Sequence, residues 1–203
     1  MPTPDISAYN ATWGICGFTS ALTHLYDSDS RLKAKIDKNG KNSDAIRLGL
    51  LTEVVTFLKY VTAFRSDLIE GLNKLNKDLN SPSMDAGVAG FIPLAEQAVR
   101  DQESIGGSNK YQCALTPEAF TLYLQEICVY KKAKLTTGSD PGGLGLLGLN
   151  KGKEGLKHWV YRDADGNVYN WGKKMSPEEW VEDKHYGLKC GGFDHVGCHI
   201  SIG

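Results

Sequence analysis

Hydrophobic residues recur every three or four positions over several stretches of the first 135 residues, which is the spacing of an amphipathic helix. The longest stripe covers residues 46–75, with Lys and Glu between its hydrophobic positions. A shorter stripe begins after Gly17, and another follows Thr116 and Pro117, residue types that favour the first turn of a helix. We therefore predict a mainly helical part over residues 1–135, with one long core helix over residues 46–75.

The pattern changes in the last quarter of the chain. Residues 158–162 and 167–171 are rich in strand-forming residues, and Asp163-Ala-Asp165-Gly166 between them is a turn sequence, so we predict a β-hairpin. The tail from His195 alternates hydrophobic and polar residues and predicts a closing strand. Together with the helical part, this β-rich part over residues 158–203 predicts an α+β fold.

Residues 136–157 separate the two parts and are rich in glycine. They lack the Gly-Lys-Ser/Thr ending of a phosphate-binding loop. Glycine lets the backbone approach a ligand closely, so we expect a flexible loop beside a groove. With 203 residues and 41% hydrophobic residues, the chain is expected to form one globular domain over residues 1–203.

Charge and hydropathy exclude several classes of function. A formal net charge of −1 gives no electrostatic reason to expect nucleic acid or an anionic membrane as a partner. No apolar run reaches the roughly 18 to 20 residues of a membrane-spanning helix. The N-terminus also lacks the basic and apolar regions of a secretory signal peptide. We expect a protein made in the cytoplasm, which a specialised secretion system could still export.

The five cysteines are an odd number, so at least one thiol has no partner within the chain. The tail gathers metal-ligand residue types, but their spacing matches no usual zinc pattern: Cys190, His195, Cys198 and His199. We therefore expect no metal site and no cofactor.

Cys16 lies where a loop meets a predicted helix. The partial positive charge of a helix N-terminus favours a thiolate over a thiol, and the thiolate is the nucleophilic form. Cys16 is thus the candidate nucleophile.

The predicted hairpin supplies two further candidates. Its closure brings His158, at the start of the first strand, close to Asn170, near the end of the second. An imidazole that takes the proton of a nucleophile needs a partner that orients its other nitrogen. We expect His158 as the base and Asn170 as its orienting partner, with Asp163 and Asp165 as alternatives to Asn170.

These segments resemble those of papain-like cysteine peptidases. Gly14-Ile-Cys16-Gly-Phe18-Thr-Ser20 is similar to the nucleophile segment of that family, and Asn170-Trp171-Gly172 is similar to its Asn-Ser-Trp-Gly segment. The order of Cys, His and Asn is also the same. The resemblance implies a papain-like fold, a Cys16–His158–Asn170 triad, and Asn10 at the offset of the Gln that stabilises the oxyanion.

The resemblance further implies hydrolysis of an amide bond in a protein or peptide substrate. A glutamine deamidase or a cell-wall amidase would use the same nucleophile. The segment from His158 to Gly172 also resembles the strand-turn-strand of YopT-type bacterial effector proteases. This implies a bacterial toxin or effector, for which a neutralising immunity protein is the expected partner.

Three alternatives stay open. Asp194-His195-Val-Gly resembles the His-Val-Gly strand of NlpC-type cell-wall peptidases, which would make His195 the base. A non-catalytic interaction domain with a vestigial site is a second alternative, and a redox or metal-binding protein is a third. Counting the reactive thiols of the native protein distinguishes them, because only the enzyme requires a reactive Cys16.

Overall fold

The computed structural model describes residues 6, 9, 15–39, 43–103, 109–182, 193 and 195–202, and it has an α+β fold. This confirms the predicted fold class at that level. The α-helices are α1 (Cys16–Ser28), α2 (Ser30–Ile36), α3 (Ser43–Phe64), α4 (Ile69–Asp78), α5 (Gly87–Arg100), α6 (Pro117–Leu122) and α7 (Pro177–Glu182). The strands are β1 (Lys134–Thr137), β2 (Gly145–Asn150), β3 (Leu156–Arg162), β4 (Val168–Asn170), β5 (Lys173–Met175) and β6 (His195–Ser201).

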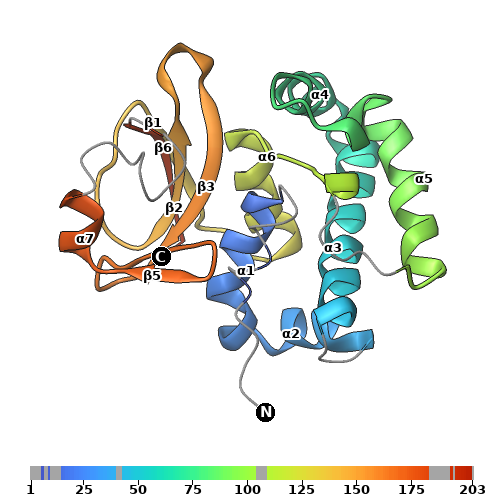
Figure 1. Ribbon diagram of the computed structural model, residues 1–203, viewed down its shortest axis with the longest axis horizontal. Helices are drawn as coiled ribbons and strands as arrows, with labels where there is room; N and C mark the ends of the chain where they lie inside the picture. Colours follow the sequence, from blue (N-terminus) through green and yellow to red (C-terminus); the bar gives the residue numbers. More distant parts are fainter. Residues whose placement is uncertain are drawn as a thin grey trace.

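The strands form one antiparallel sheet in the order β1-β6-β2-β3-β4-β5. Figure 1 shows this sheet on one side of the molecule and α3, α4 and α5 on the other, with α1 and α6 between them. Helix α1 is hydrogen-bonded to strand β3 of the sheet: the Ser20 hydroxyl donates to the Trp159 carbonyl at 2.9 Å. The start of α1 therefore lies at the junction between the helices and the sheet.

The predicted long helix over residues 46–75 is wrong as a single element. Helix α3 ends at Phe64, and α4 begins at Ile69 after a 3₁₀ turn, Ser66–Leu68. Arg65 leaves helical geometry (φ −141°, ψ 49°), and its guanidinium pairs with the Asp67 carboxylate at 2.8 Å across the bend. The hydrophobic spacing continues through the bend, so the periodicity alone could not locate it.

The expectation of a loop over the whole of residues 136–157 is also wrong, because β2 lies there, in the sheet between β6 and β3. Two glycines of β2 allow close packing. A Cβ at Gly145 would collide with the His199 ring, and one at Gly148 would collide with the Cys198 sulfur. The leucines between them are fully buried. These glycines therefore serve packing within the sheet and not flexibility.

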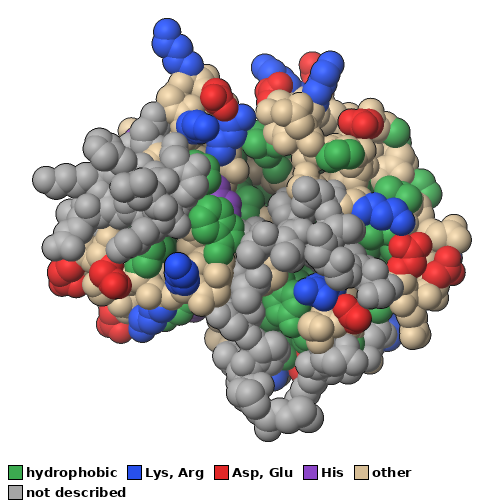
Figure 2. Space-filling view, in the orientation of Figure 1, with side chains coloured by type: hydrophobic (Ala, Val, Ile, Leu, Met, Phe, Trp, Pro, Cys, Tyr) green, Lys and Arg blue, Asp and Glu red, His purple; other side chains and the backbone are tan. Residues whose placement is uncertain are grey.

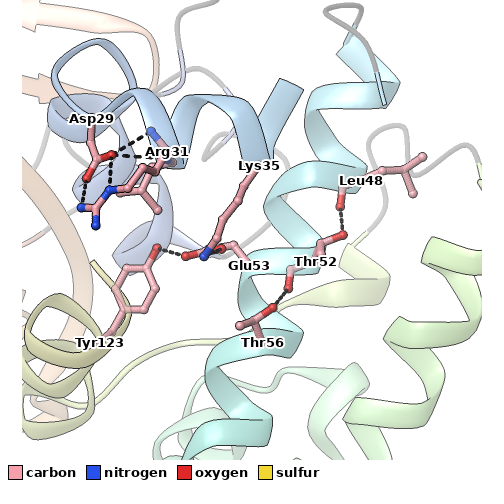
Figure 3. A network of polar contacts seen from close by, with 9 residues as sticks. Asp29, Arg31, Lys35, Leu48, Thr52, Glu53, Thr56 and Tyr123 are labelled. Atoms are coloured by element: carbon pink, nitrogen blue, oxygen red, sulfur yellow. Dashed lines mark hydrogen bonds and ion pairs between the residues drawn. The ribbon is translucent and has the colours of Figure 1, made fainter. Parts of the chain in front are cut away.

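A carboxylate is buried in α3 (Figure 3). Glu53 is 2% exposed, accepts a hydrogen bond from the Tyr123 hydroxyl at 3.2 Å, and lies 3.7 Å from the Lys35 ammonium. Burial raises the pKa of Glu53, and Lys35 opposes that shift. Because the protonated form is favoured on folding, the contribution of Glu53 to the free energy of unfolding falls as pH rises above its unfolded pKa of about 4.3.

We expect Glu53→Gln to gain stability relative to the wild type as pH rises. The gain is about 1.4 kcal/mol for each unit by which folding raises the pKa. Urea denaturation of both proteins at several pH values between 4 and 7 measures the difference. Glu96→Gln is the matched control, because Lys59, at 2.7 Å, lowers the pKa of Glu96. The stability of Glu96→Gln relative to the wild type should therefore fall as pH rises. A difference for Glu53→Gln that is constant with pH would contradict the prediction.

Candidate active site

Cys16 is the first residue of α1, as the sequence predicts, and it is 6% exposed. Burial raises the pKa of its thiol to about 11, although the backbone N–H groups of Trp159, Gly17 and Cys16 itself lower it. The helix N-terminus therefore does not produce a thiolate at rest, contrary to the expectation from the sequence. A base must take the proton for Cys16 to act as a nucleophile.

His158 and Asn170 lie on neighbouring strands of the predicted hairpin, which the structure confirms as β3 and β4. Tyr161 pairs with Tyr169, and this register places the side chains of His158 and Asn170 on the same face of the sheet as diagonal neighbours. His158 Nε2 lies 2.7 Å from Asn170 Oδ1, in a buried contact. With the amide oxygen as acceptor, Nε2 carries the proton and Nδ1 is the nitrogen that can accept one.

Aromatic rings surround the imidazole of His158. The Trp171 ring lies 5.0 Å away between centroids, and the Phe193 ring stacks on the imidazole at 5.3 Å. Burial lowers the pKa of His158 to about 4, against the hydrogen bond to Asn170, which raises it. The imidazole is therefore neutral at pH 7 and able to accept a proton.

Cys16 and His158 line the same pocket, of about 250 Å³, which we call the Cys16 pocket. Its other described lining residues come from both halves of the molecule: Leu79, Ser81, Gln112 and Ala114 from the helical part, and Lys157, Trp171 and Phe193 from the β-rich part. The structure thus brings the candidate nucleophile and the candidate base, which are distant in the sequence, to one opening.

Sequence reasoning missed the segment of residues 112–115 that forms one wall of this pocket. The buried Asn76 holds it through two hydrogen bonds to the backbone of Ala114, at 2.8 and 3.0 Å. Ser83 donates to the Gln112 carbonyl at 2.7 Å, and Trp159 Nε1 donates to the Leu115 carbonyl at 3.0 Å. These contacts hold the backbone of residues 112–115, and with it Gln112, at the pocket, and no sequence motif marks them.

The alternative residues lie elsewhere or outside the described part of the chain. Asp163 accepts hydrogen bonds from the side chains of Asn167 and Tyr169 and so braces the hairpin turn. Asp165 is exposed at that turn. His195 is exposed, and its Nε2 lies 3.3 Å from the Asn150 side chain. Asn10, the expected oxyanion donor, and Cys190 fall outside the described residues.

The chain was compared with protein-family models, with curated proteins and with solved structures. None of the three comparisons gives a match. Within the described ranges, no three His, Cys, Asp or Glu residues are grouped as a metal site. None of the helices described there is long and apolar enough to cross a membrane.

Proposed function

We propose that the protein is a thiol hydrolase that cleaves an amide bond with a papain-like Cys16–His158–Asn170 triad. The observation that carries the proposal is the buried 2.7 Å contact of His158 with Asn170, beside a pocket that His158 and Cys16 both line. A nucleophile, a base and a residue that orients the base are the parts this reaction needs.

The reaction begins from a neutral pair, a Cys16 thiol and a His158 imidazole. As the sulfur attacks the carbonyl carbon of the substrate, its proton passes to His158 Nδ1. The imidazolium then gives this proton to the leaving nitrogen as the C–N bond breaks, and an acyl-enzyme forms on Cys16. Water, deprotonated by His158, releases the acid and restores the thiol. Asn170 holds the ring in one tautomer throughout.

The negative oxygen of the tetrahedral intermediate needs hydrogen-bond donors near Cys16. The backbone N–H of Cys16 at the start of α1 is one candidate. The side-chain amide of Gln112 is a second, because Gln112 lines the pocket on a segment held by Asn76 and Ser83. Asn10 keeps the role that the family resemblance gives it.

A protein or peptide is the substrate class that this site would serve as a peptidase. Glutamine deamidation and cell-wall amide cleavage use the same steps and differ in the amide that reaches Cys16. The likeness of the hairpin to effector proteases supports a bacterial toxin or effector, with an immunity protein as its partner.

Alkylation of Cys16 by iodoacetamide tests the proposal. With burial raising its pKa to about 11, an unassisted Cys16 would react slowly at pH 7. With His158 as base, we expect labelling at pH 6 to 7, falling as pH drops through about 4, where the imidazole becomes protonated. Mass spectrometry of the digested protein locates and quantifies the label.

Two comparisons make this experiment decisive. In His158→Ala, labelling of Cys16 should require strongly alkaline pH. Cys113, fully buried with a pKa raised to about 12, is an internal control that should stay unlabelled in the native protein. Slow labelling of Cys16 that removal of His158 does not change would overturn the proposal and favour a non-catalytic interaction domain.

A further inference from the structure

We propose that the substrate carries an acidic residue on the leaving-group side of the scissile amide, and that its carboxylate binds beside Lys173. This inference rests on the proposed function and adds the substrate class. It follows from the position of a second pocket relative to His158.

The chemistry sets the direction in which the substrate runs. His158 protonates the leaving nitrogen, so the leaving group must lie on the His158 side of the Cys16 sulfur. The Trp171 ring packs against His158, at 5.0 Å between centroids. The Phe193 ring also stacks on His158, at 5.3 Å, so a leaving group that passes His158 on the side away from Phe193 meets Trp171.

Trp171 also lines a second pocket, of about 330 Å³, which we call the Lys173 pocket. Its lining residues are Asn170, Trp171, Lys173, Lys174, Met175 and Glu179. Trp171 is the wall that this pocket shares with the Cys16 pocket. A chain bound at Cys16 that continues along Trp171 therefore enters the Lys173 pocket.

The charges of the Lys173 pocket favour an anion. Lys173 is exposed and makes no ion pair within the described part of the chain. Lys174 lies 4.0 Å from Asp163 and over the Tyr169 ring. Among the described lining residues the one acidic side chain, Glu179, accepts a hydrogen bond from the Ser176 backbone N–H at 2.8 Å. Figure 2 shows Lys or Arg side chains over the β5 region of this face, with acidic side chains beside them.

The rest of the pocket suits the remainder of an acidic residue. The Trp171 ring and the largely buried Met175 offer apolar contact for the methylene groups of Asp or Glu. Asn170 Nδ2 is buried and has no hydrogen-bond partner among the described residues. A carbonyl oxygen of the substrate could accept the hydrogen bond that Asn170 Nδ2 does not make.

Three alkylating probes test the inference: iodoacetamide, iodoacetyl-Asp-Asp amide and iodoacetyl-Asn-Asn amide. In each, the Cys16 sulfur bonds to the CH₂ carbon, iodide leaves, and the thiol proton passes to His158. At low ionic strength we expect the Asp probe to label Cys16 about three to ten times faster than the Asn probe, because the exposed Lys173 ammonium, which has no ion pair among the described residues, attracts a carboxylate at short range. Lys173→Glu should abolish or reverse this ratio when each probe's rate is divided by the iodoacetamide rate of the same variant.

Lys132→Glu is the matched control, because it makes the same change of net charge at an exposed lysine that lines neither pocket. It should keep the ratio of the wild type. Equal rates for the Asp and Asn probes, or a ratio that Lys173→Glu leaves intact, would overturn the inference while the proposed function stands.

A Cys16 that does not react with iodoacetamide would overturn the proposed function instead. The inference then has a separate test, because acetyl-Asp-Asp amide should still shift the NMR signal of the Trp171 indole N–H more than acetyl-Asn-Asn amide does. Equal shifts of this signal with the two peptides would overturn the inference as well.

Discussion

Replacing either Cys16 or His158 by Ala should reduce amide hydrolysis by about 10⁴-fold or more, and replacing both should cost no more than replacing one. The reason is that, in the proposed mechanism, the two side chains act as a unit. Without the sulfur there is no acyl-enzyme, and without His158 the thiol, with its pKa raised to about 11, keeps its proton at neutral pH. Mass spectrometry of products from a peptide-amide library measures turnover for the single and double variants.

The control uses a second histidine, which lies outside the Cys16 pocket. His195→Ala removes the exposed histidine that contacts Asn150, and it should leave turnover unchanged. Thermal unfolding of each variant separates a lost reaction from a lost fold. If losses in the double variant multiply, Cys16 and His158 work independently, and the triad is wrong. If His195→Ala removes the activity and His158→Ala does not, the base is on β6.

The parts of the site that the sequence predicted are those that local pattern determines. The turn residues between two strand-forming runs place His158 near Asn170, and the pairing of β3 with β4 agrees with that prediction. The position of Cys16 at a helix start follows in the same way from the loop sequence before it and the helical spacing after it. Both inferences span fewer than about 15 residues, the range over which such patterns are informative.

What the sequence missed depends on contacts between distant segments. Asn76 makes two hydrogen bonds to the backbone of Ala114, 38 positions away, and no periodicity or spacing in the sequence predicts them. The protonation of Cys16 is a second case. The helix start alone favours a thiolate, but packing of the whole domain buries the sulfur, and burial has the larger effect on its pKa.

The glycines of β2 give a third case. From the sequence, a run rich in glycine between two parts indicates a loop, because glycine is the most flexible residue. In the folded chain, Gly145 and Gly148 face the side chains of β6, where a Cβ would collide. Only the partner strand shows that these glycines are there for close packing.

The second large effect concerns Trp171, for which we expect activity and stability to separate. Trp171 and Gly172 connect β4 to β5, and both have positive φ, 49° and 74°, as in a tight type I′ turn. Asn and Gly adopt this conformation readily, whereas a bulky side chain is strained there by about 1 kcal/mol or more. The strained residue is the one whose ring covers His158.

We expect Trp171→Asn and Trp171→Val both to lower turnover by about 10²-fold, because each removes the ring that holds His158 in place and keeps water from its bond to Asn170. Their stabilities should differ. The β-branched Val keeps the backbone strain and Asn relieves it, so the Asn variant should be more stable than the Val variant by about 1 to 2 kcal/mol, although Val is the more hydrophobic residue. Urea denaturation and turnover, measured on the same preparations, give both quantities.

A Val variant as stable as the Asn variant would show that the turn carries no strain. Unchanged turnover in both variants would show that His158 does not depend on the ring. The expected combination, equal loss of activity with unequal stability, would mean that the chain accepts an unfavourable residue in this turn because its side chain serves the site.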